Sequence, residues 1–294
     1  MSRAPETPHI VIRDIESISE MRDVELLEKE VWGCDDLDIV PLTLLAAAQE
    51  SGAILIGAFD GSSLVGFAFG FVGREDGEIV HHSHMLAVRS SYRRHNLGYR
   101  LKLAQRERAL EQGIHRMTWT FDPLQSLNAH FNFGKLGVLA NKYKINFYGE
   151  TTSSPLHQTG TDRLLVTWFL DSTRVKERIE QNSLSDFKEP IQTTLIRCNY
   201  AGAPERAATI SDSSGIAAIE IPDDISSIES KDPNLARMWR EETRHAFQEA
   251  TAAGFIVTEF VRRTVEGRVV GVYLLANRGL QDFLTPIKAG STDG

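Results

Sequence analysis

A short basic segment between an apolar stretch and an amphipathic one holds the side chains best suited to chemistry. Arg93 and Arg94 follow an apolar run that ends at Val88, and a helical period begins near Leu97. A turn that opens a helix presents unpaired N–H groups and the positive end of the helix dipole, and both attract phosphate. The sequence therefore predicts a pyrophosphate site, although a solvated basic helix start fits the same residues. Besides the two arginines, the site would comprise the main chain of His95, Asn96, Leu97, Gly98 and Tyr99.

Two histidines lie on the strand expected just before this turn. One residue separates His82 from His84, so both side chains point to the same face of a strand. An imidazole can take a proton from an amine, directly or through a water molecule. If one of them is the general base, only its neutral form is active, so we expect turnover to be lost below an apparent pKa near or somewhat above about 6.5. Histidines that only pack or face solvent fit the pattern equally, and no third residue stands at the spacing that a metal site needs.

The rest of the pattern describes the elements that must position these side chains. Strands are expected at 9–12, 53–59, 64–72, 78–88, 117–121, 139–147, 164–170, 193–197, 217–221, 255–261 and 269–275. Helices are expected at 18–32, 42–49, 97–112, 126–136 and 234–252, with a charged helical stretch from 171 to 189. This order predicts an α+β protein, with a domain at 9–171 and a smaller α+β lobe at 190–277. Residues 60–68 resemble residues 266–274, which indicates either a degenerate repeat of the first half or a second, unrelated hairpin.

Composition narrows the classes of function. The chain has 294 residues and a net charge of −8, which argues against a general binder of nucleic acid or of anionic membranes. Its two cysteines, Cys34 and Cys198, have no metal-like spacing and no disulfide pattern, so we expect a cytoplasmic protein. The apolar region from 53 to 72 is interrupted by Asp60-Gly61-Ser62-Ser63 and reads as two strands, not a membrane span. Against the acidic background, the arginines and lysine between 89 and 102 form a basic cluster.

The basic turn resembles a motif of the GNAT acyltransferase superfamily, Arg/Gln-x-x-Gly-x-Gly/Ala. Arg93 stands at its first position, Asn96 at the first glycine and Gly98 at the second. Asn departs from the motif, but it tolerates positive φ better than most residues. The resemblance implies a GNAT-like fold, in which a central mixed sheet is flanked by helices and the turn holds the pyrophosphate of an acyl-coenzyme A. It also implies that the main chain of Leu86, Ala87 and Val88 pairs with the pantetheine arm. A general base belongs on the same strand, in the region of His82 and His84.

The segment 122–138 resembles a second GNAT motif, commonly Asn-x-x-Ala-x-x-x-Tyr-x-x-x-Gly-Phe. Ala129 and Gly137 fit this pattern, whereas Phe133 stands where a tyrosine often protonates the leaving thiolate. The usual general acid is therefore missing from its place. Tyr143 and Tyr148 follow closely and are candidates for that role. Asn128 is a candidate for a hydrogen bond to coenzyme A, and an exposed helix position explains it equally well.

These observations predict an acyl-CoA-dependent N-acyltransferase that uses acetyl-CoA or another acyl-CoA as co-substrate. The expected acceptor is a small-molecule amine such as an amino acid, with no nucleic acid, membrane or metal involved. The sequence leaves a homodimer open. A non-catalytic acyl-CoA-binding or scaffold protein is the alternative, favoured by Asn96 and by Phe133. An enzyme that binds a different phosphate ligand is a third interpretation.

Overall fold

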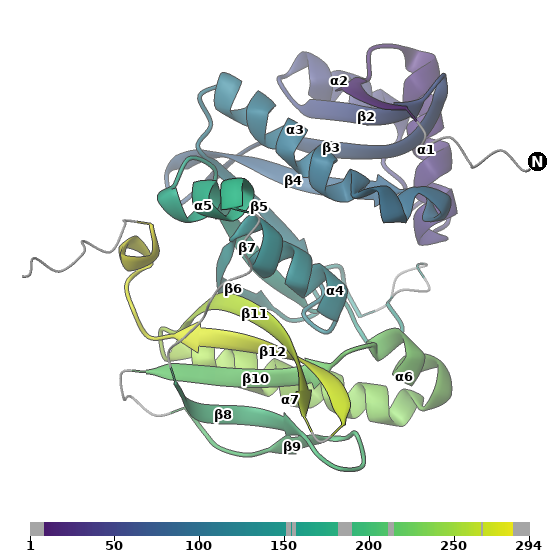
Figure 1. Ribbon diagram of the computed structural model, residues 1–294. Helices are drawn as coiled ribbons and strands as arrows, with labels where there is room; N and C mark the ends of the chain where they lie inside the picture. Colours follow the sequence, from purple (N-terminus) through teal and green to yellow (C-terminus); the bar gives the residue numbers. More distant parts are fainter. Residues whose placement is uncertain are drawn as a thin grey trace, which may run out of the picture. The chain divides into compact units, whose positions relative to one another are not determined.

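The computed structural model describes residues 9–150, 154, 157–181, 190–210, 215–265 and 267–284 (Figure 1). Contacts divide the chain into two compact units, residues 1–119 with 152–156 and residues 120–151 with 157–294. Each unit combines strands and helices, so the chain is α+β as predicted. The domain boundary predicted at residue 171 stays a prediction. The contacts divide the chain between residues 119 and 120.

The first unit contains a sheet in the order β1-β2-β3-β4-β5. These strands span Ile10–Asp14, Ile54–Asp60, Ser63–Glu75, Glu78–Val88 and Arg116–Phe121, and the unit includes β5 up to Trp119. Neighbours are antiparallel from β1 to β4, and β4 pairs with β5 in parallel. The Asp60-Gly61 turn joins β2 to β3 in the predicted hairpin, with Gly61 at a φ of 59°.

Three helices and a short 3₁₀ segment complete this unit. They are α1 (Ile18–Trp32), α2 (Leu42–Glu50), η1 (Ser90–His95) and α3 (Leu97–Glu111). A capping box between Ser17 and Glu20 starts α1, and Gly33 ends it in the left-handed conformation. The core beneath α1 and α2 includes Met85 and Ala87 of β4, whereas the side chain of Ser83 contacts α3. Helices α1 and α3 therefore contact opposite faces of β4.

The second unit is built on seven strands in the order β7-β6-β11-β12-β10-β8-β9. In chain order, β6 to β12 span Leu139–Lys144, Arg163–Phe169, Ile191–Cys198, Pro204–Arg206, Ile216–Pro222, Ile256–Val265 and Arg268–Ala276. The helical segments are α4 (Ser126–Ala129), η2 (His130–Leu136), α5 (Thr173–Gln181), α6 (Ile225–Lys231), α7 (Pro233–Ala252) and η3 (Leu280–Phe283). Tyr273 lies at the centre of its core, with its ring against Phe133, Phe247 and Phe260.

Several elements of the second unit differ from the sequence-based expectation. The sequence analysis did not anticipate α6 or β9, and the predicted helix 126–136 changes at His130 from α-helix to the π-helix η2. Gly137 ends this helix at a φ of 72°, in the left-handed conformation common at helix C-termini. The strands beside the two hairpins at 60–68 and 266–274 pair differently, since β1 pairs with the first strand of its hairpin and β10 with the second of its own, and the degenerate repeat stays a prediction.

Two further findings concern the whole described chain. Cys34 and Cys198 are both free thiols. Among the described residues, no helix is long and apolar enough to cross a membrane.

Candidate functional site

The turn before α3 has the geometry of an anion site. Asn96 adopts a φ of 55° and a ψ of 24°, and no side chain caps the first turn of the helix. The N–H groups of that turn are therefore available to a ligand at the positive end of the helix dipole. Arg93 is exposed beside them, with its Nε 3.5 Å from the carbonyl oxygen of Val88. The side chain of Arg94 lies outside the described part of the structure.

Gly98 leaves room for a larger residue as far as the protein itself is concerned. A Cβ at this position would meet only Leu86 Cδ2, at an ordinary contact distance of 3.5 Å. The fold therefore does not require glycine here, whereas a phosphate group that approaches the first turn of α3 would. The same contact shows that the start of α3 lies beside Leu86 of β4.

The predicted basic cluster does not form a single charged surface. Arg89 forms an ion pair with Glu30 at 3.2 Å, and Arg100 donates to the carbonyl oxygen of Ile10 at 2.9 Å. Lys102 points inward and is only 3% exposed. The number of basic residues along the sequence does not tell which side chains face solvent, because successive residues of a helix face different directions. Of the described side chains in the cluster, Arg93 is the exposed one at the turn.

Strand β4 separates from β5 and bulges just before it reaches this turn. The two strands pair only at His81 with Met117 and at His82 with Thr118. On its other edge, β4 pairs Ser83 with Gly70 and Met85 with Phe69, so His84 is an additional residue, a β-bulge. The bulge explains why Ser83 and Met85 face opposite sides of the sheet. Beyond His82, the β5-facing edge of β4 pairs with no strand in the described part of the chain and can hydrogen-bond an extended ligand.

His82 and His84 share a face, as predicted, and lie in a cluster of rings. The ring centroids of His82 and His84 are 6.3 Å apart, and those of Phe71 lie 5.4 Å and 5.9 Å from them. Phe69 completes the group, 6.4 Å from His84. His82 Nδ1 also lies 3.2 Å from the hydroxyl of Thr118.

The pKa of both histidines differs from the sequence-based expectation. Burial, with the charges of His84 and Lys102, lowers the pKa of His82 to about 4. Desolvation also lowers the pKa of His84. These lowered pKa values move the expected acid limb of either histidine below about 6.5, the value predicted from the sequence. Within the described residues, no group of three or more side chains is placed to hold a metal ion.

The remaining sequence-predicted residues belong to the second unit. Asn128 is exposed on α4, and Phe133 is fully buried in η2. Tyr148 is 43% exposed, with its ring 4.8 Å from that of Phe147. The hydroxyl of Tyr143 donates to Asp162 Oδ2 at 2.7 Å, and burial together with that carboxylate raises its pKa. Such a hydroxyl is a poor proton donor, so the surroundings of Tyr143 do not support its predicted role as general acid.

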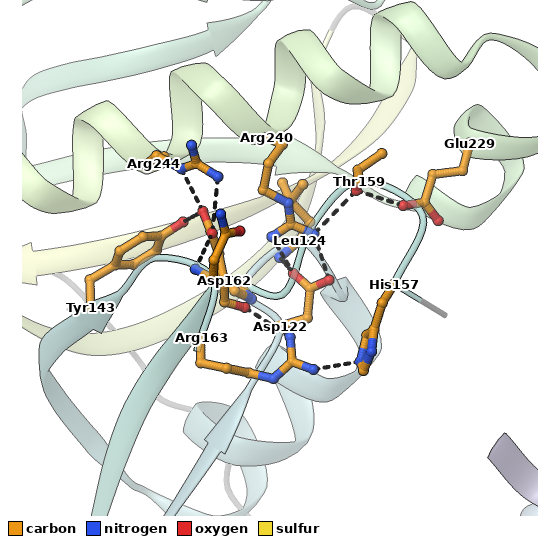
Figure 2. A network of polar contacts seen from close by, with 12 residues as sticks. Asp122, Leu124, Tyr143, His157, Thr159, Asp162, Arg163, Glu229, Arg240 and Arg244 are labelled. Atoms are coloured by element: carbon orange, nitrogen blue, oxygen red, sulfur yellow. Dashed lines mark hydrogen bonds and ion pairs between the residues drawn. The ribbon is translucent and has the colours of Figure 1, made fainter. Parts of the chain in front are cut away.

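Tyr143 is part of a network of ion pairs that joins α7 to the loops of the second unit (Figure 2). Arg240 donates two hydrogen bonds to Asp122, at 2.7 Å and 2.6 Å. One helical turn later, Arg244 donates two to Asp162, at 2.8 Å and 3.0 Å. Burial raises the pKa of Asp162, but the hydrogen bonds that it accepts hold it below its ordinary value. These bidentate pairs fix the end of β5 and the loop before β7 against α7.

The comparisons with known proteins bear on the region that contains the turn. Residues 18–137 match the family model described as the acetyltransferase (GNAT) family. This segment belongs to the GNAT superfamily. GNAT proteins transfer an acyl group from acyl-coenzyme A, and acetyl-CoA is the co-substrate of the family. No curated protein matches the chain.

Solved structures of GNAT proteins are similar to about half of the chain. The ribosomal-protein-S18-alanine N-acetyltransferase from Escherichia coli is 14% identical over 54% of this chain and 92% of its own, with a TM-score of 0.43. The aminoglycoside 6'-acetyltransferase type Ii is 17% identical over 54% of this chain and 97% of its own, with a TM-score of 0.43. The PaiA N-acetyltransferase from Thermoplasma acidophilum, in complex with coenzyme A, is 17% identical over 54% of this chain and 98% of its own, with a TM-score of 0.38.

Sequence reasoning missed several buried polar residues near the GNAT turn. Ser83, Lys102 and Gln105 form a hydrogen-bonded group between β4 and α3. Glu28 of α1 is 1% exposed and has one carboxylate oxygen without a hydrogen-bond partner. Gln105 lies four residues after the apolar Leu101 and so on the same face of the helix, which was the available signal; Lys102 directly follows Leu101 and carried no such signal.

Proposed function

We propose that the chain is an acyl-CoA-dependent N-acyltransferase whose acceptor is a small-molecule amine. The observation that carries the proposal is the course of β4, which leaves β5 after His82, bulges at His84 and ends beside the uncapped first turn of α3. An extended pantetheine arm can hydrogen-bond the free edge at Leu86, Ala87 and Val88. Its pyrophosphate would meet Arg93, Arg94 and the N–H groups from His95 to Tyr99.

The ring cluster supports an amine acceptor on the opposite face of β4 from α3. Neutral His82 or His84 can accept the proton that the amine loses on attack, directly or through water. Phe71 is 39% exposed and offers an apolar surface on which the hydrocarbon part of a small molecule can pack, with the buried Phe69 beneath it. A base whose pKa is about 4 removes protons weakly, so this assignment favours an amine that arrives already deprotonated.

A non-catalytic acyl-CoA-binding protein is the second candidate. It is favoured by Phe133, which is fully buried and has no hydroxyl to protonate a thiolate. Release of free coenzyme A in the presence of a panel of primary amines separates the two. Binding of acetyl-CoA without release of thiol from any amine favours the non-catalytic protein.

The direct test measures acetyl-CoA affinity by calorimetry in the wild type and in Gly98→Val. We expect the variant to fold and to lose most of its affinity, because the added methyl groups occupy the space that the phosphate needs. Gly73→Val is the matched control, since a Cβ there also meets a neighbour only at an ordinary 3.6 Å, from Val80. A folded Gly98→Val protein with wild-type affinity would remove the turn from the proposed site. Absence of binding in the wild type would refute the proposed function.

A further inference from the structure

A closed polar cluster lies between α3 and β4, beneath the point where β4 leaves β5. Lys102 Nζ donates to Ser83 Oγ at 2.7 Å, and Ser83 Oγ donates to Gln105 Oε1 at 2.8 Å. Lys102 Nζ also approaches Gln105 Oε1 at 3.4 Å and lies 3.8 Å above the centre of the Trp119 ring. None of these four side chains is more than 6% exposed.

The cluster buries an ammonium group that pairs with no carboxylate among the described residues. The titratable groups that face Lys102 are His81 and His82 of β4, while β5 contributes Trp119 and α3 contributes Gln105. A buried, unpaired ammonium is costly, and an apolar side chain would fill the same space at lower cost. Desolvation lowers the pKa of Lys102 to about 7. The amine can therefore both give and regain a proton near neutral pH.

The cluster lies where the sulfur of a bound thioester is expected. Ser83 is the first residue of β4 beyond the last pair with β5, and Leu86 contacts the start of α3 three residues later. Three residues of strand span about 10 Å. An arm that starts at the phosphate turn and follows the free edge of β4 thus runs toward Ser83.

We propose that Ser83 and Lys102 form a proton relay to the departing thiolate of coenzyme A. The proposal rests on the proposed function and supplies the general acid that Phe133 cannot provide. The amine nitrogen bonds to the carbonyl carbon, and the C–S bond breaks with its electron pair on sulfur. For this step the Ser83 hydroxyl turns from Gln105 Oε1 toward the sulfur, which takes its proton, and Ser83 Oγ takes a proton from Lys102 Nζ. The proton lost by the amine goes to His82, to His84 or to water, and Lys102 then regains a proton from solvent.

The test is a titration of the thiol of bound coenzyme A, which needs no acceptor amine. The ultraviolet absorbance of the thiolate is followed against pH in the complex, with desulfo-coenzyme A as the blank. The thiolate and the Lys102 ammonium stabilise each other through the Ser83 hydroxyl, so the thiol is expected to ionise while Lys102 keeps its proton, and its pKa is expected to be low in the wild type. We expect it to rise by at least about one pH unit, roughly tenfold in the equilibrium, in Lys102→Met and in Ser83→Ala. Lys176→Met, at an exposed lysine of α5, is the control and leaves the thiol pKa unchanged.

The outcomes separate this inference from the proposed function. Coenzyme A that binds all variants equally, with a higher thiol pKa in Lys102→Met and Ser83→Ala, supports the relay. Equal thiol pKa values in the wild type and both variants overturn the relay and leave the acyltransferase proposal standing. If the wild type does not bind coenzyme A, both fail. Should Lys102→Met not fold, Ser83→Ala alone decides, since it removes only the hydroxyl proposed to protonate the thiolate.

Discussion

Replacing Glu28 by glutamine should stabilise the protein at alkaline pH. Glu28 is 1% exposed, and its Oε2 accepts the amide of Val40 at 2.9 Å while Oε1 has no partner. Burial, with a smaller contribution from the charge of Glu25, raises the pKa of Glu28 from 4.5 to about 7. Between about pH 4.5 and pH 7, Glu28 is therefore protonated in the folded state and ionised in the unfolded state. Stability is highest below about pH 4.5 and falls as the pH rises through about 7.

The loss amounts to at most about 3 kcal/mol, since each pH unit between the two pKa values is worth about 1.4 kcal/mol. Glu28→Gln resembles the protonated form at every pH. We expect it to match the wild type near pH 4.5 and to exceed its free energy of unfolding by up to about 3 kcal/mol at pH 8. Urea unfolding at several pH values measures this, and amide hydrogen exchange of α1 reports the first unit separately.

Glu25→Gln is the comparison, because Glu25 also accepts one backbone amide, that of Leu42, but is only half-buried; since its charge contributes to the shift of Glu28, it should reduce the pH dependence only slightly. Parallel pH profiles for the wild type and Glu28→Gln would refute the reasoning. They would mean that water or a rearranged neighbour solvates the Glu28 carboxylate in the folded state.

Other substitutions test the remaining features. Arg178→Met should destabilise the second unit by about 3 kcal/mol in chemical unfolding, because it removes a buried partner of Glu259 and the donor to the carbonyl oxygens at the end of η2. Asn96→Val should lower stability by about 1–2 kcal/mol through its positive φ, whereas Asn96→Gly should not; equal melting temperatures would contradict this. If His82 is the base, turnover should stay level from pH 5 to pH 6.5 and fall only near its pKa of about 4, and a limb at pH 6.5 in the pH–rate profile would exclude it. A chain that ends at Thr173 should bind a dye for exposed apolar surface, because residues 120–171 share their core with β11 and β12.

The strand, turn and helix that form the proposed coenzyme A site could be predicted from the sequence. Their signals are local, since an apolar run, a basic turn and a helical period follow one another between residues 78 and 111. The predicted bounds 78–88 agree with β4, and the predicted start near Leu97 agrees with α3. The bulge at His84 could not be predicted, because register depends on which residues of β3 lie opposite.

Burial of charged residues was the main feature beyond the reach of the sequence. Lysine and glutamate are almost always solvated, so a sequence gives no reason to place Lys102 or Glu28 in a core. The pKa of His82 escaped prediction for the same reason, since its shift depends on neighbours from β3 and α3. The short helix α6 has seven residues, too few for a helical period to appear.

The π-helical turn in η2 affects how a motif can be transferred along the chain. Gly137 donates its N–H to Asn132, five residues back, so this turn contains one residue more than a turn of α-helix. A comparison that counts positions equates Phe133 with the motif tyrosine on the assumption of constant helical pitch. With an additional residue in the turn, the equivalent place in space moves to a neighbouring position. When motif positions are only counted, a one-residue insertion in the helix looks the same as a substitution of the catalytic residue. A catalytic side chain can therefore seem to be missing when it stands at a neighbouring position of the sequence.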